Sequence, residues 1–336
     1  MKKNLLLLSF IISIGIISLE YFANIQINNL IDRNGYTKEL IEFHDYYYKE
    51  LHHLGRLNEV DAQNPSSLMF DKIGDGTSCV IIQGDSWAEQ YRTDNSKEYL
   101  TNFCKEQKQF KFILAGTGSY SPSIMTSQLF LLRNDFDHNP EYLIAIIDQT
   151  DIGDEICRYK KLRKKENGRV IVGPEDKNSI EYNSSFYIMD NFKMFFSDNY
   201  SIIKVLNYFK NNYIQKRNQK KYKIRCKKDQ ILNPLKRGLS DSEEKYMITI
   251  LNDYFNEAFS SPALKKLIVI THPHRKHLSG EYIVNISELV YKAKLQSIYN
   301  KNIEIVSFLK NFKDFLRDDM NEVFVEHYAY SHLQDN

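Results

Sequence analysis

The chain has few cysteines, and their spacing excludes two common uses of this residue. It contains four in 336 residues, and no two of them form a C-x-x-C pair. A zinc motif or a thioredoxin-like motif built on neighbouring cysteines is therefore not indicated. In an exported chain disulfides are permitted, so two arrangements stay open: pairing of Cys79 with Cys104 and of Cys157 with Cys226, or free buried thiols.

A strong charge of one sign is also lacking. The formal net charge is +2, which favours no class of partner, and we expect no nucleic acid to bind. The chain is 42% hydrophobic and 13% aromatic, enough for a sizeable core, and no internal repeat is visible. Lysine and arginine concentrate within about 158–237, which indicates a solvated basic face or a surface that attracts anionic polysaccharide or lipid headgroups.

The N-terminus carries an apolar run without a good cleavage site behind it. Two lysines precede Leu5–Leu19, and Glu20 ends the run. The one plausible cleavage point is after Ala23. A small residue is needed at the third position before the cut, and that position holds Tyr21. We therefore expect residues 1–24 to be an uncleaved, single-pass signal anchor in the cytoplasmic membrane, with the rest of the chain on the exported side.

From Thr77 onward short apolar runs alternate with amphipathic ones, as a parallel sheet flanked by helices requires. We predict strands at Cys79–Gln83, Lys111–Ala115, Tyr142–Asp148, Lys266–Thr271 and Ile303–Phe308. We predict helices at about Ala88–Lys105, Ser121–Arg133, Asp241–Phe259 and Val284–Asn300. Ser240 and Glu243 form a capping box before the third of these helices. The fold class expected is α/β: a doubly wound, flavodoxin-like parallel sheet of about five strands with helices on both faces.

Two regions stand outside this alternation and divide the chain into parts. Residues 25–76 are expected to be a helical stalk that joins the anchor to the α/β domain. That domain is expected to span 77–336, with a long basic insertion at about 158–237.

Candidate catalytic groups follow the predicted strands. The stretch "VIIQGDSWAEQ" places Ser86 at a strand-to-helix turn, where an α/β protein exposes reactive groups. In "AGTGSYSPS", Gly116 and Gly118 allow a tight turn beside a helix N-terminus, which would leave N–H groups available as oxyanion donors. Near the C-terminus, "FVEHYAYSHLQDN" supplies His327 and His332. A serine, a backbone donor and a histidine are the parts that acyl transfer needs.

These residues resemble the SGNH or GDSL-type hydrolases. "GDSW" is similar to the family's first block, with Ser86 as the nucleophile, and "GTGSYSP" is similar to its second, with Gly118 rather than Gly116 as the oxyanion glycine. The resemblance covers Ser78 to about Cys157 and about Ser240 to His332. It implies a serine esterase or O-acetyltransferase.

Two blocks depart from the family pattern. Gly-x-Asn-Asp is replaced by Asp148-Gln149-Thr150-Asp151, so the side-chain oxyanion donor would be Thr150 or Gln149. The aspartate of Asp-x-x-His is replaced by Ala329 if His332 is the base. A Ser-His dyad, or a carboxylate such as Glu326, would then have to replace the full triad.

A histidine cluster in "THPHRKHL" offers a rival chemistry. The H-x-H-x-x-H spacing of His272, His274 and His277 could bring imidazoles onto one metal in a metal-dependent hydrolase. Because no carboxylate-rich motif accompanies it, we expect no metal and no cofactor. We expect instead that the side chains contacting substrate are Asp85, Asp151, His272 and His274.

The functional expectation is an anchored, exported acyl hydrolase or O-acyltransferase. The resemblance implies an acylated polysaccharide or glycan, with an acetyl ester, as the substrate at the cell surface. A non-catalytic carbohydrate-binding protein that kept the fold is the alternative from another class.

Overall fold

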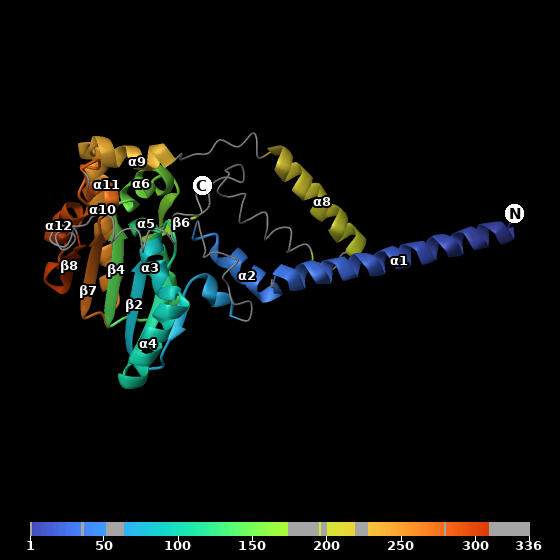
Figure 1. The fold of residues 1–336 in the computed structure, drawn as a ribbon, viewed down its shortest axis with the longest axis horizontal. Coiled ribbons are helices and arrows are strands. Elements are labelled where there is room, and N and C mark those ends of the chain that lie inside the picture. The colour runs from blue at the N-terminus through green and yellow to red at the C-terminus, as the bar shows by residue number, and fades with distance from the viewer. Residues whose placement is uncertain are drawn as a thin grey trace. The chain divides into compact units, whose positions relative to one another are not determined.

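A six-stranded sheet forms the centre of the larger part of the protein (Figure 1). The computed structural model describes residues 2–34, 37–51, 64–173, 195, 200–218, 228–278 and 280–308. In this part of the chain the strand order is β1-β3-β2-β4-β7-β8. The strands are β1 (Asp71–Ile73), β2 (Ser78–Gly84), β3 (Phe110–Gly116), β4 (Tyr142–Asp148), β7 (Lys266–His272) and β8 (Ile303–Ser307). All five predicted strands are present, each within one residue of its expected ends.

The sheet is mixed but mostly parallel. β2, β3, β4, β7 and β8 run parallel, whereas β1 pairs antiparallel with β3 at the edge. The register places Gly84 opposite both Gly116 and Ile146, and Asp148 opposite His272. The carboxyl ends of four neighbouring strands therefore meet at one edge of the sheet, and the strand order reverses beside β2.

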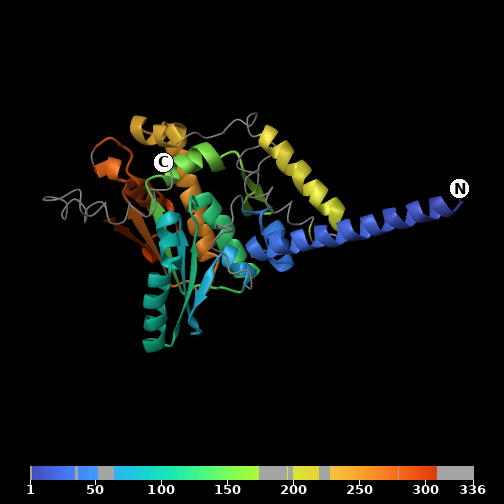
Figure 2. The same ribbon diagram turned by 45° about the vertical axis from the view of Figure 1, so that its right-hand side comes forward.

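Helices cover both faces of this sheet (Figure 2). Val80 and Ile82 of β2 share one apolar cluster with Leu100 of α4. Because side chains alternate along a strand, Gln83 points to the opposite face, where Tyr254 of α10 donates to it. The principal helices are α4 (Asp94–Glu106), α5 (Pro122–Asn134), α10 (Asp241–Phe259) and α12 (Ile286–Gln296). The predicted α/β class with helices on both faces is confirmed.

A buried polar network joins β2 to the helices on this second face. The Gln83 side-chain amide donates to the Met125 carbonyl at 2.8 Å and to Gln128 Oε1 at 2.7 Å. The Tyr254 hydroxyl donates to Gln83 Oε1 at 3.0 Å, and the Gln128 amide donates to the Met69 carbonyl at 3.2 Å. Since each of these buried groups is hydrogen-bonded, the network specifies how α5 and α10 pack on β2.

The start of α10 follows the sequence signal. Ser240 Oγ accepts the Glu243 N–H at 3.4 Å, and the Glu243 carboxylate accepts the Ser240 N–H at 2.9 Å. The helix runs over the predicted range, and both halves of the capping box are formed. Such caps satisfy backbone donors that would otherwise have no partner at a helix start.

The single helix predicted over 88–105 is divided. The chain forms the short helix α3 (Ser86–Glu89), then a 3₁₀ turn, and then α4 after Thr93. Thr93 has an extended backbone, with φ −76° and ψ 156°, and its hydroxyl donates to the Gln90 carbonyl at 2.7 Å. This hydrogen bond from a side chain to the backbone competes with continuation of the helix. The spacing of apolar residues does not predict such a bond.

A strand of the sheet falls within the range expected for the stalk. β1 lies within 25–76, the range assigned to the stalk, yet it pairs with β3, so the boundary at residue 76 falls inside the sheet region. A strand of three residues is too short to give an apolar pattern. The insertion range contributes the hairpin β5–β6 (Arg163–Glu166 and Arg169–Val172) and the helix α9 (Lys228–Arg237), which packs on α6 (Asp151–Asp154). It also contributes α8 (Ser201–Asn218).

Cys79 and Cys104 do not form the disulfide that the sequence had left open. Cys79 and Cys104 are both buried and both free. Burial raises the pKa of the Cys79 thiol to about 11, so it stays protonated and unreactive. Cys157 is disulfide-bonded, and Cys226 lies outside the described residues.

The chain divides into two compact units, and the smaller one contains the N-terminal helix. It comprises Met1–Lys49, Arg56–Leu68 and Glu175–Ile224, and the larger comprises Glu50–Gly55, Met69–Pro174 and Arg225–Asn336. In the smaller unit α1 (Lys2–Asn34) packs against α8. The Glu20 carboxylate of α1 accepts the N–H groups of Ser201 and Ile202, and so caps the start of α8.

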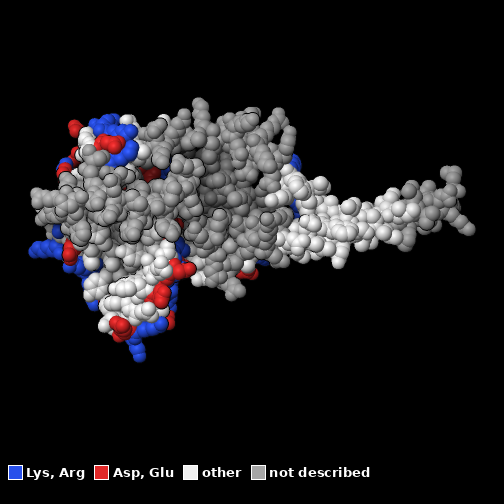
Figure 3. Space-filling model, viewed as in Figure 1, with Lys and Arg blue, Asp and Glu red and all other residues white. Residues whose placement is uncertain are grey.

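The described surface of α1 is almost entirely without charged side chains in Figure 3, and its apolar side chains between Ile11 and Phe22 are exposed. Ile17, Leu19 and Phe22 are each more than 60% exposed. The segment Ile11–Asn29 has a mean hydropathy of 1.3, and by length and composition it could cross a membrane.

Candidate active site

The first predicted turn lies directly after β2. A side chain at Gly84 would meet the Ile146 carbonyl at 2.3 Å, so glycine is needed where β2 passes β4. Asp85 caps α3 by accepting the Trp87 N–H at 3.0 Å. Ser86 is the first residue of α3, is half-buried, and donates its hydroxyl proton to Asp85 Oδ2 at 3.3 Å.

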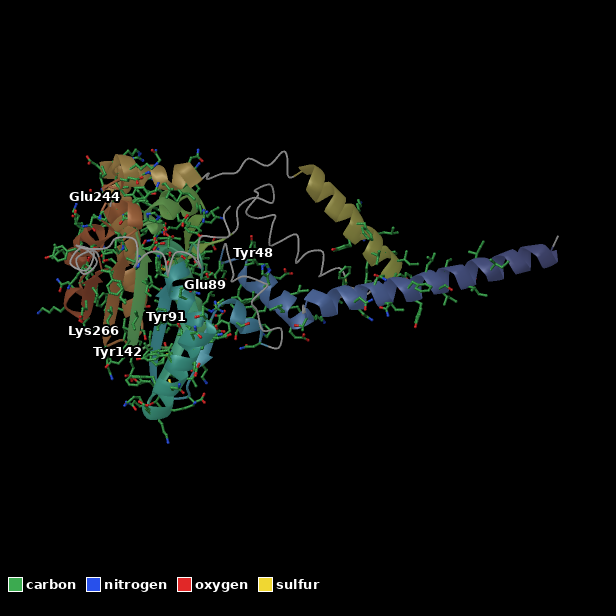
Figure 4. The ribbon with its side chains drawn as sticks, viewed as in Figure 1. Tyr48, Glu89, Tyr91, Tyr142, Glu244 and Lys266 are labelled. Atoms are coloured by element: carbon green, nitrogen blue, oxygen red, sulfur yellow. The ribbon has the colours of Figure 1, made fainter. Side chains whose placement is uncertain are left out.

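The turn after β3 packs against the helix that carries Ser86. The Thr117 N–H donates to the Gly84 carbonyl at 3.0 Å, which joins the two turns. A side chain at Gly116 would lie 2.1 Å from the Ala88 backbone, whereas one at Gly118 would lie 3.2 Å from the Glu89 carboxylate. Glu89, labelled in Figure 4, is thus on the side of α3 that faces this turn. The Gly118 N–H makes no hydrogen bond to the described residues.

The helix start that follows this turn is already occupied. Ser121 Oγ donates to Glu155 at 2.7 Å, and both the backbone N–H and the hydroxyl of Ser123 donate to the same carboxylate. Tyr246 contributes a further hydroxyl at 3.3 Å. The N-terminus of α5 therefore receives a carboxylate of the protein itself, an anion that the sequence pattern did not reveal.

The third turn is organised by Asp148, the last residue of β4. Its Oδ1 accepts the Thr150 N–H, the Thr150 hydroxyl at 2.6 Å and the Asp151 N–H at 3.1 Å. Asp151 Oδ2 accepts the Asp148 N–H at 3.0 Å. Gln149 points elsewhere, because its amide donates to the Val284 carbonyl and accepts the Ile286 N–H. The Thr150 hydroxyl and the Gln149 amide are therefore both engaged in holding local structure.

Trp87 connects three of these strand ends. Its indole N–H donates to Asp148 Oδ2 at 3.2 Å, which links α3 to the end of β4. Its ring stacks on the imidazole of His272, the last residue of β7, with 3.7 Å between centroids. Phe308 meets the same imidazole edge-on at 6.3 Å. The indole thus joins the turn that carries Ser86 to Asp148 at the end of β4 and to His272 at the end of β7.

Three buried aspartates lie together at this edge. Asp85, Asp148 and Asp151 each offer a carboxylate oxygen within 4.8 Å of the other two, and all three side chains are buried. Burial raises the pKa of all three carboxyls, and the charge of Asp148 raises that of Asp85 further. The sequence had indicated Asp85 and Asp151 as substrate contacts, and the structure gives them mainly backbone partners.

The histidines expected near the site are not all brought together. His272 lies beside Trp87, whereas His274 accepts the Lys276 N–H and lies 5.1 Å from the Tyr282 ring. In the described part of the chain the group with metal-ligand geometry is the aspartate cluster, not the H-x-H-x-x-H histidines. His327, His332 and the alternative carboxylate Glu326 lie outside the described residues.

Trp87 and Asp148 were given no role in the sequence analysis. Trp87 is the single tryptophan of the chain and directly follows the candidate nucleophile. Asp148 is a charged residue at the end of an apolar strand. A polar residue where a buried strand meets the open edge of a sheet is a usable signal for a site.

Comparisons of the chain with family models, with curated proteins and with solved structures gave no match.

Proposed function

We propose that this protein is an SGNH-like serine acyl hydrolase or O-acyltransferase with Ser86 as its nucleophile. The observation that carries the proposal is the position of Ser86, on the turn after β2 where the strand order reverses. Open α/β sheets bind their ligands in the crevice beyond such a point. We assign the parallel strands, which follow the order 2-1-3-4-5, to a doubly wound, flavodoxin-like sheet with β1 added at its edge.

Two backbone donors support an acyl-transfer site. The Ser86 N–H begins α3, where no intrahelical acceptor exists, and the Gly118 N–H makes no bond to the described residues. The turns that carry them are joined by the bond from Thr117 to Gly84. We place the oxyanion of the tetrahedral intermediate between these two N–H groups. Thr150 has a different role, because its hydroxyl donates to Asp148 and so holds the third turn.

In the proposed reaction, the Ser86 hydroxyl oxygen attacks the ester carbonyl and its proton passes to a histidine. The alcohol leaves with that proton, and an acyl-serine ester remains. Water or a sugar hydroxyl then attacks this ester and releases Ser86. We propose His332 as the base, and we propose that His272 and His274 line the substrate side of the crevice.

We propose an O-acylated glycan outside the cytoplasmic membrane as the substrate. The apolar helix α1 supports attachment to a membrane, and the disulfide bond of Cys157 suits an oxidising compartment. The acetyl group and the glycan come from the resemblance of "GDSW" and "GTGSYSP" to anchored SGNH proteins. Hydrolysis and transfer differ only in which acceptor reaches the acyl-serine.

The test uses the full chain in detergent, an aryl acetate and a fluorophosphonate probe that labels activated serines. We expect acetate release and labelling by the wild type, and loss of both in Ser86→Ala. Ser242→Ala, which removes a serine on the exposed start of α10, should keep both. His332→Ala should lose activity while His327→Ala keeps it.

Full hydrolysis by Ser86→Ala would overturn the proposal. Normal folding together with no hydrolysis and no labelling in the wild type would favour the non-catalytic carbohydrate-binding alternative. Circular dichroism of each variant separates loss of chemistry from loss of fold.

A further inference from the structure

The aspartate cluster presents oxygen ligands from two separate turns. Asp85 comes from the turn after β2, and Asp148 and Asp151 come from the turn after β4. One carboxylate oxygen of each lies within 4.8 Å of the other two. Two oxygens bound to one ion at 2.0–2.6 Å can be no more than about 4–5 Å apart, so this spacing suits a shared cation.

Within the described part of the chain, one oxygen of the cluster accepts no hydrogen bond. Both oxygens of Asp148 accept hydrogen bonds, from Thr150, Asp151 and the Trp87 indole. Asp85 accepts the Trp87 N–H and the Ser86 hydroxyl. Asp151 is fully buried, yet among the described residues only its Oδ2 accepts a bond, and its Oδ1 has no hydrogen-bond partner there. A buried carboxylate oxygen without a donor is costly, and a bound ion is one of its established explanations.

The described residues around the cluster supply no cation that pairs with it. None of the three aspartates forms an ion pair within the described residues. The two arginines nearest along the chain pair elsewhere, Arg158 with Asp154 at 3.2 Å and Arg92 with Asp71 at 2.9 Å. Three carboxylates buried together strongly disfavour ionisation unless a cation or protons compensate them.

We propose that Asp85, Asp148 and Asp151 bind a divalent cation of the Mg²⁺, Ca²⁺ or Mn²⁺ class. A ligand set made only of carboxylates favours such hard ions over zinc or copper, which prefer imidazole and thiolate. The ion ties the turn after β2 to the turn after β4 and so fixes the backbone that presents Ser86. Its binding does not depend on Ser86 being a nucleophile.

The single tryptophan gives a direct test. The Trp87 indole nitrogen lies 3.2 Å from Asp148, so a Tb³⁺ ion at the cluster should emit when tryptophan is excited. We expect the full chain in detergent to give saturable Tb³⁺ emission. Ca²⁺, Mg²⁺ or Mn²⁺ should compete for the site, and K⁺ should not. Ser86→Ala should keep this emission whether or not the enzyme proposal holds.

Matched variants locate the ion. Asp151→Asn should weaken Tb³⁺ binding at least about tenfold, whereas Asp94→Asn, on the exposed start of α4, should leave it unchanged. Trp87→Phe should lose the emission but keep Ca²⁺ binding in calorimetry. Circular dichroism verifies the fold of each variant.

Two results would overturn the site. Emission that does not saturate in the folded wild type would exclude a specific ion, and emission kept by Asp151→Asn would place the ion elsewhere. If Asp151→Asn does not fold, two other measurements replace it: Tb³⁺ binding by Asp85→Asn, and the melting temperature of the wild type with and without calcium. A wild-type melting temperature that none of the three ions raises would indicate carboxyls that share protons, and not a metal site.

Discussion

The indole ring of Trp87 stacks on the imidazole ring of His272 with 28° between their planes. A ring stacked on an indole face shapes the environment of the fluorophore. Because Trp87 is the only tryptophan, its emission reports on this contact. His272→Gln should change the emission spectrum of the folded protein, and His274→Gln should leave it. An unchanged spectrum in His272→Gln would contradict the stacking.

Two glycines of the second turn should respond very differently to a methyl group. In Gly116→Ala the new carbon would lie 2.1 Å from the backbone of Ala88, which cannot move without shifting α3. We expect the free energy of unfolding to fall by about 1–3 kcal/mol or more. Gly118→Ala meets only the end of the Glu89 side chain, at 3.2 Å, and should change stability by less than about 0.5 kcal/mol. Urea unfolding followed by Trp87 fluorescence measures both, and equal losses would refute this packing.

The hydroxyl of Tyr254 should stabilise the second face of the sheet. Tyr254→Phe removes the donor to Gln83 Oε1 and leaves that buried oxygen without it. We expect a loss of about 1–3 kcal/mol in the free energy of unfolding. The matched change Tyr291→Phe, at a residue 54% exposed, should be nearly neutral. Equal effects of the two substitutions in urea unfolding would show that the network contributes little.

His138 should make stability depend on pH. Burial among Phe70 and Phe136, with help from Lys111 and Lys72, lowers its pKa from 6.5 to about 4. Between these values the unfolded chain binds a proton that the folded protein does not, so the free energy of unfolding falls as pH drops from 6.5 to about 4. Above pH 6.5 the group has no effect. His138→Gln should therefore lose less stability than the wild type over this range, and parallel pH profiles would count against the assignment.

The N-terminal helix should hold the protein in membranes. Ile11–Asn29 has 19 residues, about 28 Å of helix at roughly 1.5 Å per residue, which nearly matches a hydrocarbon core of about 30 Å. We expect detergent, and neither high salt nor carbonate, to extract the protein. Protease added outside the cytoplasmic membrane should reach the α/β domain. Recovery of a soluble exported protein that begins near Asn24 would instead identify a cleaved signal peptide.

Much of the sheet could be predicted because its strands are apolar runs with clear ends. Tyr142–Asp148 and the capping box at Ser240 were predicted at the residues where they occur. β1 was missed because three residues carry no periodicity and its pairing with β3 is set by tertiary contacts. The break at Thr93 depends on one side-chain hydrogen bond to the backbone, which composition does not encode.

The site was only partly predictable for a related reason. Ser86, Gly118 and Thr150 follow strands and could be found by position alone. The roles of Trp87 and Asp148 could not, because they depend on which strands become neighbours. β4 pairs with both β2 and β7, and this pairing brings the indole to Asp148 and His272. The aspartate cluster likewise joins Asp85 to Asp148 and Asp151, which lie 63 and 66 positions further along the chain.

The cap that Glu20 places on α8 also sets an order of events during synthesis. Its backbone partner Ser201 follows it by 181 residues. At a synthesis rate of about 5–20 residues per second, roughly 10–40 s therefore pass between the synthesis of Glu20 and that of Ser201. The strands β2, β3 and β4 are made within that interval. The first half of the sheet can therefore pair before the smaller unit closes, and α1 is complete before its partner helix exists.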